Sequence, residues 1–419
     1  MQCSRSSWQW SLCIVLLGLN VPISALRAAD RGPLQATDFL PAGYATDGSK
    51  CYQDAIQKAL DTAAAEHRQL VFQPIVYRID DPRGLQLHSG MTLSLYGAVF
   101  RVSATAHSDG QVFLGRDVTD VTILGGELAG QRKSWPDSVN IAGIRIYGRS
   151  ARIRVRDIYA HDLSSNAVGI FGTASTPIRQ VWLHGVVAER CCNKYTDYLQ
   201  PHTGPAKGSQ REDQGTVALY YVHDFVVDGC SFLDSRSDGT HFYRCRNGRF
   251  ANNRVAGSTM GGYFVESSQT VLATGNVIEN NGSRGVTIEA GSRDCTLINN
   301  LVAGSGREGL WAPDSIRVVV TGNIFRRNGR KNDGDKDGEI MINESSWDPP
   351  KTPRAENYRI ANNLFETTAT QGATIRVRPK VTDVIIEHNT FRGPVRTIDV
   401  KGVPPGVVHV VVRSNDGID

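Results

Sequence analysis

Four segments of the chain share one pattern, a leading glycine followed by a short alternating strand: 239–244 (GTHFYR), 262–267 (GYFVES), 285–290 (GVTIEA) and 309–314 (GLWAPD). The leading glycines are spaced 23, 23 and 24 residues apart. A repeat of this length holds three short strands and three turns, whereas helical repeats need about 33 residues or more. The pattern therefore predicts coils that stack on one another, so that each strand joins a long parallel sheet.

A second series of residues, all asparagines, keeps step with the glycines. Its members are Asn253, Asn276, Asn300, Asn323, Asn363 and Asn389, and the first four are 23, 24 and 23 residues apart. An asparagine at one turn of each coil can adopt the left-handed backbone conformation, and its amide can bond to the same residue in the next coil. The two series together predict an all-β solenoid, a parallel β-helix of about 10–12 coils.

The N-terminal segment supports the same fold. The segments 46–48, 54–60, 70–74 and 76–79 (TDG, DAIQKAL, LVFQP and VYRI) resemble the opening of the pectate-lyase-like right-handed β-helix superfamily. The resemblance implies a right-handed parallel β-helix whose open end is covered by a capping helix, here at 52–65 with apolar residues on one face. It identifies the fold far better than the activity, because the superfamily contains lyases, hydrolases, epimerases and phage tail spikes.

The chain is predicted to be exported and to fold as one domain. Arg5 precedes an apolar stretch at 12–19 that is too short to span a bilayer, and small residues follow it, as in a cleaved signal peptide. We therefore expect a secreted or periplasmic protein. The predicted divisions are a signal peptide at 1–29 and a single β-helix domain at 30–419, with an N-terminal cap at 36–80, coils at 85–415 and loop insertions at 193–214 and 330–339.

The composition excludes several classes of partner. The 46 Lys and Arg residues and the 42 Asp and Glu residues leave a net charge of +4, which is too dilute for a nucleic-acid-binding face. No second apolar run approaches the length of a membrane span. We expect a polysaccharide substrate, no nucleic-acid partner, no membrane span and a monomeric chain. The six cysteines after the signal peptide could form disulfides or remain as buried thiols.

Alternation along the repeated strands indicates which side chains point outward. If Phe242, Val265 and Ile288 face the core, the outer face of their sheet carries His241, Tyr243, Phe264, Glu266, Glu289 and Trp311 in neighbouring rows. Stacked like charges destabilise a sheet unless something neutralises them, and exposed aromatic patches usually have a use. We interpret this face as a sugar-binding groove in which Phe264 and Trp311 contact the substrate. The alternative is that loops cover these aromatics as a second hydrophobic cluster.

Three classes of function fit this face, and the first is a lyase or C5-epimerase of uronate polysaccharides. This chemistry needs a base, an acid and a cation that neutralises the sugar carboxylate. Tyr243 and His241 could serve as base and acid, with Arg284, Arg244 or a calcium ion as the cation. A neutral tyrosine is a poor base unless a cation lowers its pKa, so this assignment requires arginine or calcium nearby. Arg244 is the weaker candidate, because alternation turns it inward unless the strand ends at Tyr243.

The second class is a glycoside hydrolase that uses Glu266 and Glu289, which stand one coil apart in equivalent positions. The third class is a non-catalytic β-helix that binds polysaccharide through its aromatic face alone. We favour the first class over these two.

The two insertions precede outward strand segments and should both rise beside the same face. The first carries three further candidates for substrate binding, Lys194, Tyr195 and His202. Simple tolerance of insertions at the surface is the alternative for both loops.

The acidic segment 333–344 matches the twelve-residue calcium loop pattern, D-x-D-x-D-G-x5-E. Its predicted ligands are Asp333, Asp335, Asp337 and Glu344. Calcium is therefore the one cofactor that the sequence predicts. A mobile acidic loop is the alternative, because residues 340–343 have the pattern of a coil strand, which could direct Glu344 away from the other carboxylates.

Overall fold

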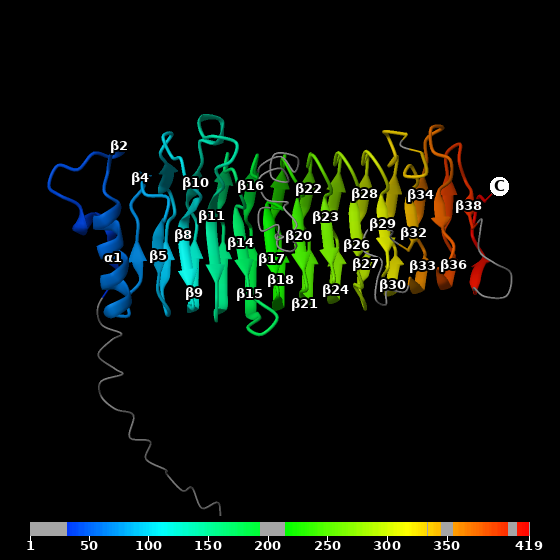
Figure 1. The fold of residues 1–419 in the computed structure, drawn as a ribbon, viewed down its shortest axis with the longest axis horizontal. Coiled ribbons are helices and arrows are strands. Elements are labelled where there is room, and N and C mark those ends of the chain that lie inside the picture. The colour runs from blue at the N-terminus through cyan, green and yellow to red at the C-terminus, as the bar shows by residue number, and fades with distance from the viewer. Residues whose placement is uncertain (1–31, 193–213, 333, 345–354, 401–408, 419) are drawn as a thin grey trace, which may run out of the picture. The chain divides into compact units, whose positions relative to one another are not determined.

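The structure is a computed structural model, and it describes residues 32–192, 214–332, 334–344, 355–400 and 409–418. The described strands form three parallel sheets of 14, 13 and 12 strands, here called sheets A, B and C. A complete coil passes through sheets C, A and B in that order, and the next coil then begins. Within the unit Pro33–Asp419, the strands follow one another in chain order from α1 to β38 (Figure 1).

The strands of sheet A are β1 (Leu34–Gln35), β3 (Leu70–Val71), β6 (Thr92–Ser94), β9 (Thr119–Leu124), β12 (Ala151–Arg156), β15 (Ile178–His184), β18 (Val222–Asp228), β21 (Arg246–Ala251), β24 (Gln269–Thr274), β27 (Thr296–Ile298), β30 (Ile316–Thr321), β33 (Glu356–Ala361), β36 (Thr382–Glu387) and β39 (Val410–Arg413). Those of sheet B are β2 (Asp47–Cys51), β4 (Val76–Ile79), β7 (Val99–Val102), β10 (Glu127–Ala129), β13 (Tyr159–His161), β16 (Val187–Glu189), β19 (Ser231–Leu233), β22 (Arg254–Ala256), β25 (Val277–Glu279), β28 (Leu301–Ala303), β31 (Ile324–Arg326), β34 (Leu364–Glu366) and β37 (Thr390–Arg392). Those of sheet C are β5 (Leu85–Leu87), β8 (Gly110–Arg116), β11 (Ile141–Tyr147), β14 (Val168–Phe171), β17 (Val217–Tyr220), β20 (Thr240–Tyr243), β23 (Tyr263–Glu266), β26 (Val286–Glu289), β29 (Leu310–Pro313), β32 (Ile340–Asn343), β35 (Ile375–Val377) and β38 (Ile398–Asp399).

The predicted all-β solenoid is confirmed. The four glycine-led segments form strands β20, β23, β26 and β29, which are consecutive neighbours in sheet C. Sheet C agrees with the predicted 10–12 coils, and the described parts of sheets B and A have one and two strands more than its twelve. Parallel pairing in unbroken register explains the regular spacing, since each coil must return to the same point around the axis.

The asparagine series forms a ladder of hydrogen bonds in the turn between sheets A and B. The Asn276 side chain donates to Asn300 Oδ1 at 2.8 Å, and the Asn300 side chain donates to Asn323 Oδ1 at 2.9 Å. Asn415 continues the ladder beyond the predicted members, because it accepts the Asn389 amide at 3.0 Å. The prediction that the ladder asparagine is left-handed was wrong: positive φ belongs to the residue before it, such as Asn299 at 54°.

Apolar side chains fill the space between the sheets. One cluster of buried residues extends from Ala36 to Phe391. Helix α1 (Gln53–Ala65) lies where the sequence predicts a helix, and it contributes Ile56, Ala59, Leu60 and Ala63 to this cluster; its role as a cap stays a prediction. Two 3₁₀ helices, η3 (Ala36–Phe39) and η4 (Arg132–Ser134), are the other helical elements of the described residues.

The cysteines after residue 29 are all free thiols, and five of the six are buried. The predicted signal peptide at 1–29 lies outside the described residues. Among the residues that are described, no helix has the length and apolar character that a membrane span requires.

Candidate functional site

The outer face of sheet C carries the predicted residues in two register rows. Phe242, Val265 and Ile288 are buried in the core, as alternation predicts. On the outer side, Tyr243 pairs with Glu266, and Glu266 pairs with Glu289 in the next coil. Strand spacing places such neighbours about 4.8 Å apart at the backbone. The fold therefore brings Tyr243, Glu266 and Glu289 into one continuous row.

His241 lies in the adjacent row and is the centre of a hydrogen-bonded chain. Its Nδ1 lies 2.9 Å from the Tyr220 hydroxyl, and its Nε2 lies 3.1 Å from Glu266 Oε2. The ring also stacks on Phe264, with centroids 4.5 Å apart and an interplanar angle of 9°. His241 is only 3% exposed, whereas the Glu266 side chain is 21% exposed. Among these hydrogen-bonded residues, Glu266 is therefore the one that a bound molecule can reach.

Tyr243 and Arg244 lie next to Glu266. Burial raises the pKa of the Tyr243 phenol, although the nearby Arg244 opposes this effect. Strand β20 ends at Tyr243, and Arg244 follows in the left-handed region with φ 53°. This turn leaves Arg244 exposed, with its guanidinium 5.3 Å from the Tyr243 ring centroid. The strand thus ends at Tyr243, which is the condition under which Arg244 could face outward and serve as the cation.

Arg284 occupies a different environment. Its guanidinium lies 3.8 Å from the Trp311 ring centroid, and its Nε lies 3.6 Å from the fully buried Glu308. Burial lowers the pKa of Arg284, while Glu308 and, more weakly, Glu289 and Asp238 oppose this. Arg284 is therefore close to the predicted row, but its charge is already partly balanced within the protein.

The predicted sugar-binding aromatics have little open surface. Phe264 and Trp311 are each 8% exposed, because one face of each ring is covered by His241 or Arg284. The Trp311 indole also donates to Asn343 Oδ1 at 2.8 Å. Their role in substrate binding stays a prediction.

A second aromatic cluster lies further along the same face. Phe171, Ala218 and Tyr220 form its buried centre, and Tyr147, Tyr221 and Tyr243 pack against it. Of the residues predicted for the outer face, Tyr243 packs against this cluster. The candidate site begins where the aromatics of this face give way to the carboxylates.

The two insertions differ in what the structure describes. Lys194, Tyr195 and His202 lie outside the described residues. In the second insertion, Asp337 pairs with Arg376, and Asp335 pairs with Arg378 at 2.8 Å. Arg376 belongs to β35 and pairs in register with Met341 of the same outer row. The described part of this loop is thus held against the outer face of sheet C by these ion pairs.

The predicted calcium ligands are separated by these ion pairs. Asp337 also accepts the Gly372 backbone N–H at 2.8 Å, and Glu344 pairs with Lys380 at 3.3 Å. Asp333 lies outside the described residues, and no group of three His, Cys, Asp or Glu side chains suited to a metal occurs among those that are described. A calcium ion would have to displace the arginines from Asp335 and Asp337. Calcium stays a prediction from the sequence pattern and enters no step below.

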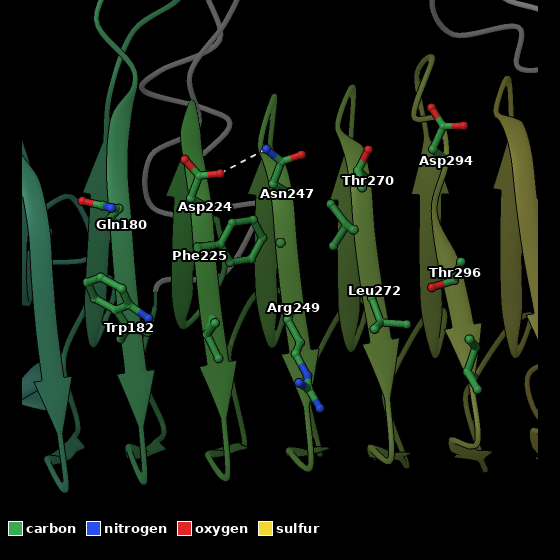
Figure 2. A pocket seen from close by; sticks show the side chains of 14 residues that line it. Gln180, Trp182, Asp224, Phe225, Asn247, Arg249, Thr270, Leu272, Asp294 and Thr296 are labelled. Carbon is green, nitrogen blue, oxygen red and sulfur yellow. Dashed lines mark hydrogen bonds between the residues drawn. The ribbon is translucent and has the colours of Figure 1, made fainter. Parts of the chain in front are cut away.

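One cavity lies on sheet A, and a second lies where sheet C turns into sheet A. The larger, about 700 Å³, lies on sheet A over β15, β18, β21, β24 and β27. Figure 2 shows that its labelled residues come from corresponding points on successive strands, with Asp224 bonded to Asn247 at 3.0 Å. This cavity is shallow and mostly apolar, and it holds no candidate acid–base pair, so we place the site on sheet C. The smaller cavity, about 310 Å³, adjoins Arg244.

Two residues of this region were missed by the sequence reasoning. Tyr220 stands 23 residues before Tyr243, one repeat away, but the insertion at 193–214 interrupts the glycine series just before it. Glu308 precedes the leading Gly309 in the position that Asp238 and Arg284 occupy in earlier coils. Extending the repeat backwards from Tyr243, and comparing the residues before each glycine, would have found both.

Comparisons with known proteins agree with the fold. A family model described as a right-handed β-helix region matches residues 215–346. The A-module of the mannuronan C-5 epimerase AlgE6 from Azotobacter vinelandii is similar, with a TM-score of 0.71, 16% identity and coverage of 91% of this chain and 98% of that module. An exopolygalacturonase from Thermotoga maritima (TM-score 0.55, 12% identity, 92% of each chain) and PfbA, a surface adhesin of Streptococcus pneumoniae (TM-score 0.59, 13% identity, 92% and 93%), are also similar. No curated protein sequence matches the chain.

The sheets and these matches identify a right-handed parallel β-helix protein. This fold is consistent with the pectate-lyase-like superfamily, which the N-terminal segments resemble.

Proposed function

We propose that this chain is a carbohydrate-active enzyme that removes the C5 proton of a uronate residue in an anionic polysaccharide, as a β-elimination lyase or a C5-epimerase. The observation that carries the proposal is the hydrogen-bonded chain Tyr220–His241–Glu266 beside Tyr243 and Arg244. Proton abstraction next to a carboxylate needs a base, an acid and a cation. All three kinds of group lie where strands β20 and β23 end.

Glu266 is the base in this proposal. Both nitrogens of His241 are engaged, so the imidazole holds the Glu266 carboxylate in a fixed orientation. The C5–H bond breaks, and its electron pair spreads into the sugar carboxylate, whose charge Arg244 balances. Epimerisation at C-5 is also the activity named for one of the proteins that share this fold.

Tyr243 is the acid. Burial raises the pKa of its phenol, which keeps it protonated at neutral pH. In a lyase, Tyr243 donates this proton to the oxygen that leaves C4 as the glycosidic bond breaks. In an epimerase, a proton returns to the opposite face of C5 and no bond in the polymer is cut.

We further propose that the enzyme is exported by the signal peptide at 1–29 and works as a monomer.

A glycoside hydrolase is the second candidate, and one observation favours it. Glu266 and Glu289 are register partners on adjacent strands of one face. Retaining hydrolases use two carboxyl groups about 5–5.5 Å apart, a separation that neighbouring strands can provide. One of the proteins that share this fold is named an exopolygalacturonase.

The test is incubation with polymannuronate, polygalacturonate and neutral polysaccharides in deuterated water. New reducing ends together with the absorbance of unsaturated uronate mean a lyase, and deuterium at C5 without new ends means an epimerase. New ends without that absorbance mean a hydrolase. Binding without any reaction would overturn the enzyme proposal in favour of a binding protein.

The variants Glu266→Gln and Tyr243→Phe should each lower turnover by about 10³-fold, because each loses a group that transfers a proton. Glu279→Gln is the matched control, since Glu279 lies on sheet B at 25% side-chain exposure and is paired with Arg254. It should keep full turnover. Full activity in both site variants would place the chemistry elsewhere.

A further inference from the structure

The smaller cavity beside the candidate site is strongly basic. It lies where sheet C turns into sheet A, and it is lined by Arg244, Arg246 and Arg293 together with His223 and Tyr221. All three arginines are exposed. Among the described residues, no carboxylate forms an ion pair with any of them; Arg293 donates to Gln269 Oε1 at 2.9 Å, and Arg244 lies over the rings of Tyr221 and Tyr243. Most arginines elsewhere on these sheets have an acidic partner, such as Asp294 for Arg317.

The register of the coils explains why the charges converge. His223, Arg246 and Gln269 are register partners near the starts of β18, β21 and β24, and Arg293 forms an isolated bridge with Gln269 just before β27. Arg246 and Arg293 are therefore two coils apart, or about 10 Å at the backbone. Arg244 joins them from the preceding turn, because its left-handed conformation directs it outward. The three guanidinium groups thus come from separate points of the coil to one cavity.

The state of His223 agrees with a positive potential in this cavity. Its pKa is lowered first by burial and then by the charges of Arg179 and Arg246, while Asp224 opposes the shift. His223 is therefore neutral at pH 7 and can accept or donate a hydrogen bond. The Ser267 hydroxyl also lines the cavity but donates to Ala290 O at 2.9 Å, so the arginines are the main donors to a bound group. Guanidinium groups around a small cavity suit an oxyanion.

We propose that this cavity, the arginine pocket, binds a carboxylate or sulfate group on the sugar residue next to the one that reacts. The proposal rests on the proposed function only for the position of that sugar. Arg244 links the two regions, because it lines the pocket and also lies over Tyr243. The enzyme would then require acidic groups on successive sugars, and a polymer with isolated uronates would bind poorly.

Affinity measurements on the full mature chain test the pocket without relying on turnover. The probes are oligogalacturonate and oligomannuronate for carboxylates, dextran sulfate for sulfates, and dextran as the neutral polymer. The double variant Arg246→Gln, Arg293→Gln should weaken binding of the preferred acidic probe at least about tenfold and reduce its dependence on salt. Arg249→Gln is the matched control, because Arg249 is exposed on the same sheet but lines the other cavity. Its affinity should stay unchanged.

The outcomes separate this proposal from the proposed function. Loss of affinity in the double variant supports the pocket even if no reaction is found. Unchanged affinity and KM in the double variant overturn the pocket, although the enzyme proposal would stand if Glu266→Gln is inactive. Failure of the native chain to bind any acidic probe, or equal binding of dextran, also overturns the pocket. The probe that binds best decides between carboxylate and sulfate.

Discussion

The inside and the outside of this β-helix use the same repeat in opposite ways. In the turn between sheets A and B, an asparagine recurs from coil to coil, and each bonds to the next. On the outside of sheet C, one register row changes from Tyr220 and Tyr243 to Glu266 and Glu289. The same residue in every coil is enough to hold stacked coils together. The outer row of sheet C instead changes its residues from coil to coil, which stacking does not require, and we therefore take this row as the candidate site.

Replacing a central ladder residue should give the largest effect on stability. Asn300→Ala removes the acceptor for the Asn276 backbone N–H and side chain, and it removes the donor to Ala273 O. Each buried polar group left without a partner costs about 1–3 kcal/mol, so we expect a loss of about 4 kcal/mol in the free energy of unfolding. Denaturant unfolding followed by circular dichroism measures it.

Asn415→Ala is the matched comparison. Asn415 accepts the same two hydrogen bonds from Asn389, but it ends the described ladder and is only half-buried. Water can replace its bonds, so the loss should be less than half of that for Asn300→Ala. Equal losses at the two positions would show that burial of the ladder is not what stabilises the coils.

Glu339 extends the comparison between inside and outside, because it places a titratable carboxyl group in the interior, where the asparagine ladder is uncharged. A second polar row links Ser305 to Asn328 and Asn328 to Glu339, where Gln371 also donates at 2.8 Å. Burial raises the pKa of Glu339 from 4.5 to about 7, although the hydrogen bonds from Asn328 and Gln371 oppose this. The folded chain therefore holds this proton more tightly than the unfolded chain does.

The pH dependence follows from that difference. Stability from Glu339 is fully present below about pH 4.5 and is lost as the pH rises through about 7, by up to about 3 kcal/mol. Glu339→Gln should flatten the free energy of unfolding across this range, and Glu279→Gln, at a half-buried position, should leave the slope as it is. An unchanged slope in Glu339→Gln would mean that the carboxylate is not buried as described.

The periodicity of the sequence determines how much of the fold and of the candidate site could be predicted. The 23-residue step located strands β20, β23, β26 and β29, and alternation placed His241, Glu266 and Glu289 on one outer face. The backbone at the end of each strand was not predictable in this way, because alternation stops at a left-handed residue. Alternation therefore ranks Arg244 as the weaker candidate, although the structure leaves its side chain exposed.

Burial of the outer face was equally beyond the sequence pattern. The pattern shows that His241 points outward, but not that Tyr220 and Phe264 enclose it. Counting one repeat back from Tyr243 reaches Tyr220 without crossing the insertion, but the repeat does not show that the Tyr220 hydroxyl bonds to His241. Long-range contacts made by the stacking of coils decide which group a bound molecule can reach, and here Glu266 is more exposed than His241.

The smallest effect on the free energy of unfolding is expected in the acidic loop, which belongs neither to the asparagine ladder nor to the candidate site. Asp335 is largely exposed and paired with Arg378, and exposed ion pairs contribute about 0–1 kcal/mol. Because arginines already neutralise Asp335 and Asp337, we expect Asp335→Ala to lower the free energy of unfolding by less than about 1 kcal/mol, and a chelator to leave the Tm unchanged. Mass spectrometry of the native protein should then find no bound metal. A lower Tm in chelator, reproduced by Asp335→Ala and reversed by added calcium, would instead establish the calcium site that the loop pattern predicts, with the arginines displaced when the ion binds.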